Sequence, residues 1–178
     1  MASQAQISLE ALGTALDQTH EVLLSVSPDR MHDPTPCMEW NVSDLIAHLV
    51  ADPPNFIAMA SGEQPDWSAS PPLPDDWAGE FRAGADDLLG MWRQAGDSAE
   101  AQSMDWQTAE FAVHTWDLVR ALGAPTELNP LVAERGYAFM SSALTPDNRG
   151  EAFAPAVEVS ADAQIYDRLA ALAGRDPR

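Results

Sequence analysis

Positive charge is scarce in this sequence. Nine lysine and arginine residues stand against 28 aspartate and glutamate residues, and the formal net charge is −19 at pH 7. A surface this acidic repels the phosphates of nucleic acids and the headgroups of anionic lipids. We therefore expect neither nucleic acid nor a membrane as a partner. The acidity is explained by solubility in the cytosol or by a salt-adapted or GC-rich source organism, and the first explanation is favoured.

Cysteine and long apolar stretches are scarce too. The single cysteine, Cys37, excludes an intramolecular disulfide. No apolar stretch approaches the roughly 20 residues that cross a bilayer, and residues 1–6 lack the features of a signal peptide. We therefore expect a cytoplasmic protein. Its 178 residues, 46% of them hydrophobic, predict one domain over residues 1–178 whose core folds without a metal.

Apolar residues recur at helical spacing through most of the chain. Helices are predicted over residues 8–26, from 41 through 59, over 77–95 and 104–122, from 129 onward, and over 162–173. The Pro53-Pro54 pair predicts a kink, Gly62–Asp76 a long loop, and residues 153–159 a short extended segment. Because no βαβ rhythm appears, the sequence predicts an all-α fold, a four-helix bundle with short extra C-terminal elements.

The ends of three predicted helices carry explicit signals. Asn41 is a good N-cap, and Asp44 stands three residues after it. Gly123 and Pro125 end the helix over 104–122. Asn129, followed by a proline, begins the next helix.

The helix over 104–122 carries a polar stripe. Glu110 and His114 are four residues apart and share one face, which Asp117 and Arg120 continue. Apolar residues flank this stripe on both sides, and buried polar side chains are costly unless each has a partner. A metal ion is one partner that satisfies a carboxylate and an imidazole together.

A third candidate ligand, His48, lies in an apolar run of an earlier helix. If the two helices pack side by side, His48 can meet Glu110 and His114. Two histidines and one carboxylate would hold a cation and leave coordination positions open, the pattern of a catalytic metal site. No glycine-rich phosphate loop, Cys-x-x-Cys pair or Gly-x-Ser-x-Gly segment offers a different chemistry.

Ordinary packing explains the same residues without a metal. A lone histidine on an apolar face is more often a hydrogen-bonded core residue, and a Glu-x-x-x-His pair is a common helix pair. Arg120 can simply pair with Asp117 or Glu110. From spacing alone, this structural explanation is slightly favoured.

Three segments resemble one known family. The first is the run from Thr35 to Val50, which includes His48; the second is Glu110–Gly123; the third comprises residues 153–155, 161–169 and 174–177. Together they resemble an actinobacterial branch of the DinB/YfiT-like superfamily, related to the metal-binding domain of mycothiol-dependent maleylpyruvate isomerase. The likeness spans nearly the whole chain.

This resemblance implies a four-helix bundle that binds a divalent metal, zinc or alternatively nickel, through His48, Glu110 and His114. It also implies mycothiol as a co-substrate, whose sulfur the metal would activate as a thiolate. Asp117 would then orient a ligand or bind solvent. From its place on the same helix face alone, Arg120 is expected to hold an anionic substrate.

Three functional hypotheses remain open. The first is a metal-dependent thiol S-transferase or isomerase, whose partners are a small-molecule thiol and an electrophile. The alternative is a non-catalytic metal-binding or sensing module. The third is a helical domain without a metal that works by self-association, for example as a homodimer.

Overall fold

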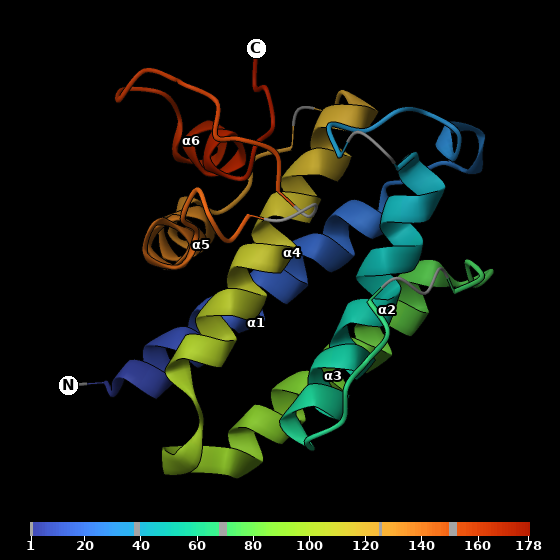
Figure 1. Ribbon diagram of the computed structural model, residues 1–178. Coiled ribbons are helices and arrows are strands. Elements are labelled where there is room, and N and C mark those ends of the chain that lie inside the picture. The colour runs from blue at the N-terminus through green and yellow to red at the C-terminus, as the bar shows by residue number, and fades with distance from the viewer. Residues whose placement is uncertain (1, 38–39, 68–70, 125, 150–152) are drawn as a thin grey trace.

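Four long helices run side by side and form the body of the molecule (Figure 1). The computed structural model describes residues 2–37, 40–67, 71–124, 126–149 and 153–178. The bundle helices are α1 (Gln4–Leu24), α2 (Val42–Ala60), α3 (Trp77–Ala95) and α4 (Ala101–Leu122). Each of α1 and α2 packs against both α3 and α4. The predicted pairing of the second and fourth helices is thus present.

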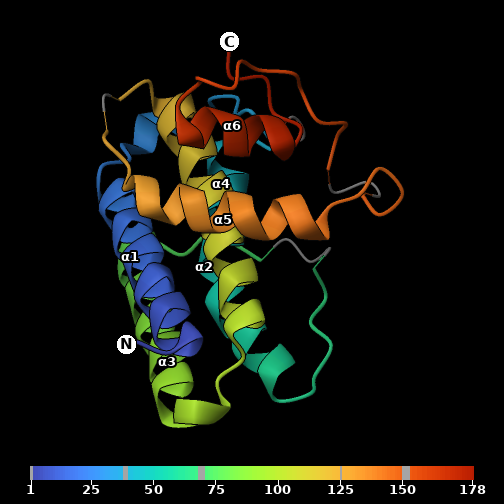
Figure 2. The same ribbon diagram turned by 90° about the vertical axis from the view of Figure 1, so that its left-hand side faces the viewer.

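Two shorter helices complete the fold. α5 (Pro130–Ala143) and α6 (Ile165–Leu172) pack on α4 and on each other. They run across the bundle (Figure 2). Residues 153–160 before α6 form no helix, and the Val157 amide donates to the Ala171 carbonyl at 2.9 Å. In the described residues the only strand-like pairing is an isolated bridge between Pro34 and Asn41, so the all-α prediction is confirmed.

The helix ends follow local chemistry. Asn41 and Asp44 form the reciprocal capping box at the start of α2, and Asn129 caps α5. Gly123 ends α4 in the left-handed conformation, with φ of 62°, which a side chain would disfavour. Pro125, the other predicted stop, lies outside the described residues.

Helix α1 begins four residues before the predicted start at Ser8. Ser3 and Gln6 form a capping box, which begins the helix at Gln4. The apolar periodicity that predicts helices begins only at Leu9, which explains the error.

Helix α2 continues through Pro53 and Pro54, as predicted. Proline lacks the N–H that an interior helical position would donate. Pro53 is buried, and a Cβ added at Gly84 of α3 would lie 3.2 Å from its Cβ. The two helices therefore approach closely here, where glycine leaves room for the proline ring.

Between α2 and α3, the described parts of the predicted loop over 62–76 hold no helix. Residues 68–70 lie outside the described residues. Trp67 packs from this loop against Phe56 and Trp106, with ring centroids 5.6 and 6.3 Å away. Within the described parts of the chain, none of the helices has the length and apolar character of a membrane span.

Candidate metal centre

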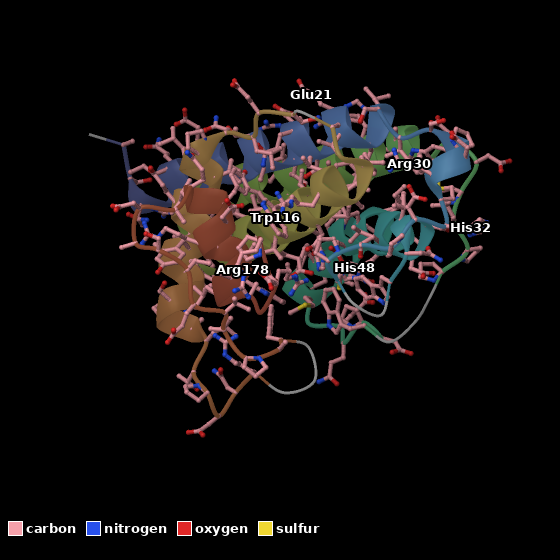
Figure 3. All side chains as sticks on the ribbon, turned by 90° about the horizontal axis from the view of Figure 1, so that it is seen from above. Glu21, Arg30, His32, His48, Trp116 and Arg178 are labelled. Atoms are coloured by element: carbon pink, nitrogen blue, oxygen red, sulfur yellow. The ribbon has the colours of Figure 1, made fainter. Side chains whose placement is uncertain are left out.

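The facing sides of α2 and α4 bring three side chains together. Glu110 Oε1 lies 3.0 Å from His48 Nε2 and 3.1 Å from His114 Nε2. One ligand atom from each residue falls in a set whose members all lie within 4.8 Å of one another. His48 is among the side chains between the helices in Figure 3, whereas the exposed His32 lies at the rim.

Trp40 covers the two imidazoles. Its ring centroid lies 4.6 Å from that of His48 and 5.6 Å from that of His114. The indole precedes the Asn41 cap, so the start of α2 also fixes the ring over the site. The place of Trp40 just before this cap indicates packing against the helix start, whereas its contact with α4 depends on how the helices pack.

A buried ion pair supports His114 from behind. His114 Nδ1 lies 3.1 Å from Asp117 Oδ2. Arg175 donates to the same carboxylate from Nε at 3.3 Å and from Nη2 at 3.1 Å. Asp117 is fully buried and Arg175 is 7% exposed. With the Nδ1 proton held by Asp117, the Nε2 nitrogen of His114 faces Glu110, and loss of its proton would free a lone pair for a cation.

Asp52 stands one helical turn after His48 on the same face of α2. The carboxylate is fully buried, and its Oδ2 lies 3.3 Å from His48 Nε2 without hydrogen-bond geometry. Neither of its oxygens has a hydrogen-bond partner. Burial raises the pKa of Asp52 to about 7, although the charge of His48 opposes this.

The charges of the facing residues stabilise one another. Burial acts to lower the pKa of His114, but Glu110 and Asp117 outweigh it and raise that pKa to about 10. Burial acts to raise the pKa of Glu110, but His114 and His48 outweigh it and hold that pKa well below its usual range. The metal-free cluster thus carries a carboxylate and an imidazolium, with a proton where a cation would bind.

The cluster is open on one side. The side chains of His48 and Glu110 are 17% and 20% exposed, whereas that of Asp117 is fully buried. A small molecule can therefore approach from the side of His48 and Glu110. Polar groups behind His114 are shielded from water, which strengthens their electrostatic interactions.

Residues 12–122 match the family model of the mycothiol maleylpyruvate isomerase N-terminal domain. The chain belongs to this family. The match includes α2 and α4 with their three facing side chains. This chain is similar over most of its length to two uncharacterized proteins of Mycobacterium tuberculosis, one from strain CDC 1551 / Oshkosh and one from strain H37Rv. Each is 27% identical over 181 residues, which cover 92% of this chain and 95% of the relative. No solved structure matches the chain.

The donor set of this family member fits a divalent cation. Two imidazole nitrogens and a carboxylate oxygen are ordinary ligands of zinc and nickel. The unpartnered carboxylate of Asp52 beside them is costly to bury, and a nearby cation would compensate its charge. His48, Glu110 and His114 thus form a group that could hold a metal ion, with Asp52 next to His48.

Two arginines of this family member make contacts that the sequence does not predict. Arg120 lies over the Trp116 ring at 5.3 Å and donates to the Pro177 carbonyl at 2.6 Å, so these contacts lead away from the cluster. Its role in substrate binding stays a prediction. Arg175 is the arginine that contacts Asp117. In the sequence, only its place in residues 174–177, part of the third segment that resembles the family, points to it.

Cys37 also lies closer to the cluster than its sequence neighbours indicate. One atom each of Cys37, His114 and Asp117 fall within 4.8 Å of one another. No base stands beside Cys37 in the sequence, and His114 comes from a distant helix. Burial raises the pKa of the thiol despite the charges of His114 and Arg175, which favours the neutral, packed form.

Proposed function

We propose that this protein binds a divalent cation at His48, Glu110 and His114 and uses it to activate a small thiol. The thiol is of the mycothiol type, and the reaction is a transfer to, or an isomerisation of, a small electrophile. One observation carries the proposal: three ligand atoms from two helices converge on a side of the bundle that solvent reaches. Membership of the mycothiol maleylpyruvate isomerase N-terminal domain family supports the choice of thiol.

A cation at this position favours the thiolate form of a bound sulfur, which is the nucleophilic form. The residues of the chain do the rest. Asp117 holds the proton on His114 Nδ1 and so keeps Nε2 directed at Glu110. Trp40 covers both imidazoles and excludes water from one side of the site. The exposed edges of His48 and Glu110 leave the approach for thiol and electrophile.

Zinc is the first metal to test, and nickel the second. Imidazole ligands suit both cations, and selection between them in proteins depends on geometry, ligand type and metal availability more than on raw affinity. We propose zinc because a site with three protein ligands and open positions is typical of catalytic zinc.

The metal content of untagged protein tests the proposal. The wild type should hold about one equivalent of metal, and the His48→Ala, Glu110→Ala double variant should lose it. Conjugation of thiols to electrophiles should then stop on chelation and return on adding metal. A wild type that neither contains nor takes up metal, or turnover unaffected by His114→Ala, would contradict the proposal.

A second candidate function is a non-catalytic metal-binding or sensing module. The observation that favours it is Asp52, because another carboxylate beside the three ligands reduces the positions that a substrate can occupy. Cobalt(II)-loaded protein separates the two. A visible spectrum that changes on adding a small thiol indicates an exchangeable position and the enzyme, whereas an unchanged spectrum indicates the module.

A further inference from the structure

Asp52 is the one buried carboxylate of the described residues with neither oxygen hydrogen-bonded. The other fully buried acid, Asp117, is paired with Arg175 and His114. Burying a carboxylate without hydrogen-bond donors costs free energy, and proteins normally pair such a group or use it as a metal ligand. The isolation of Asp52 therefore needs an explanation that packing does not provide.

The position of Asp52 supplies one. Its Oδ2 lies 3.3 Å from His48 Nε2, the nitrogen that also faces Glu110 Oε1 at 3.0 Å. Two ligand atoms that each bind one cation at about 2.0–2.2 Å lie about as far from each other as these pairs do. His48 and Asp52 are four residues apart on α2, and Glu110 and His114 are four apart on α4. Each helix thus carries one imidazole and one carboxylate near the cluster. The oxygens of Asp52 lie outside the set of His48, Glu110 and His114 atoms that are within 4.8 Å of one another, so this carboxylate would turn toward Glu110 and His114 to join them on a cation.

We propose that Asp52 is a fourth metal ligand, so that the site has two histidines and two carboxylates. This inference rests on the proposed function, since it requires the cation at His48, Glu110 and His114. Two carboxylates neutralise a divalent cation in a partly buried site. A cation that accepts five or six donors keeps positions open for a thiol, and even zinc can expand to five.

The alternative is that Asp52 only supports His48 from the outer shell. Nε2 is the metal-facing nitrogen, however, and an outer-shell partner binds the other ring nitrogen. Asp52 approaches Nε2 itself. A direct ligand and an outer-shell partner also differ in what they do to the spectrum of the bound metal, which makes the two separable.

The test is a cobalt(II) titration of metal-free wild type, Asp52→Asn and Asp87→Asn, with chelator competition. Asp87→Asn removes the same charge from an exposed position on α3 and controls for the acidity of the surface. For Asp52→Asn we expect an affinity loss beyond the tenfold to hundredfold range, approximately, of an outer-shell partner. We also expect a changed visible cobalt spectrum, and Asp87→Asn should match the wild type.

Thermal unfolding gives a second, independent measurement. Asp52→Asn should raise the midpoint of the metal-free protein, because it removes a buried charge, and should reduce the increase that cobalt causes. An unchanged cobalt spectrum in Asp52→Asn, at any affinity, would overturn the fourth-ligand assignment and leave the proposed function intact. A wild type that binds no cobalt would overturn both.

Discussion

Arg175 offers the sharpest test of the structure, because it links the C-terminal segment to the centre of the bundle. Its guanidinium reaches Asp117 through two hydrogen bonds of 3.1 and 3.3 Å, and both residues are almost entirely removed from water. Among the described residues, Arg175→Ala would leave the Asp117 carboxylate with His114 as its only partner. Breaking a buried ion pair from one side costs about 3–5 kcal/mol. For a chain of this length, the unfolding midpoint should fall by roughly 6–20 °C.

The free energy of unfolding is measured by urea denaturation followed by circular dichroism. The control is Arg178→Ala, which removes the same type of side chain from an exposed pair with Asp176. That change should leave the midpoint unaltered, since exposed ion pairs contribute little. Asp117→Asn added to Arg175→Ala should recover most of the loss, because an amide needs no cation. Loss of less than about 1 kcal/mol in Arg175→Ala would show that the pair is not buried as described and would refute the reasoning.

Three further predictions follow from packing and from the charges of the cluster. Gly136→Ala should lower the free energy of unfolding in urea by about 1–2 kcal/mol, because its Cβ would lie 3.1 Å from the Ala109 backbone. Gly90→Ala meets open space and should stabilise α3. Equal effects of the two changes would contradict the packing of α5 on α4. Metal affinity should rise about tenfold per pH unit between pH 7 and 9, since the cation must displace the proton of His114, whose pKa is about 10; calorimetric titrations at several pH values measure this, and a flat profile would be evidence against it. The metal-free protein should lose stability as pH rises from 6.5 to 10. The pKa of His114 is raised to about 10 in the folded state, so its proton stabilises the fold fully below pH 6.5 and no longer above pH 10. Unfolding midpoints that increase over this range would argue against a protonated His114.

Much of the bundle can be predicted from local sequence. The capping box at Asn41 and the glycine at 123 fix helix ends through hydrogen bonds within a few residues, so pattern and outcome agree. The meeting of His48 with Glu110 and His114 follows from one face of each helix once α2 and α4 are neighbours. That these residues bind a metal stays a proposal.

The parts that sequence does not predict depend on long-range packing. Periodicity places Arg120 on the face of Asp117, but Trp116 and the Pro177 carbonyl engage it, and Arg175 takes the place beside Asp117. No local rule connects residue 175 with residue 117. The burial of Asp52 likewise depends on the closeness of α2 and its neighbours, which two prolines in the helix do not foretell.

The separation of the two ligand pairs along the chain has a consequence for local unfolding. His48 and Glu110 are 62 residues apart, with α3 and both of its connections between them. A bound cation would therefore close a large loop, and any opening that separates α2 from α4 would have to release it. Amide hydrogen exchange along both helices should slow in proportion to metal occupancy, even at positions far from the ligands. The cation would thus make two helices that are distant in sequence behave as one cooperative unit.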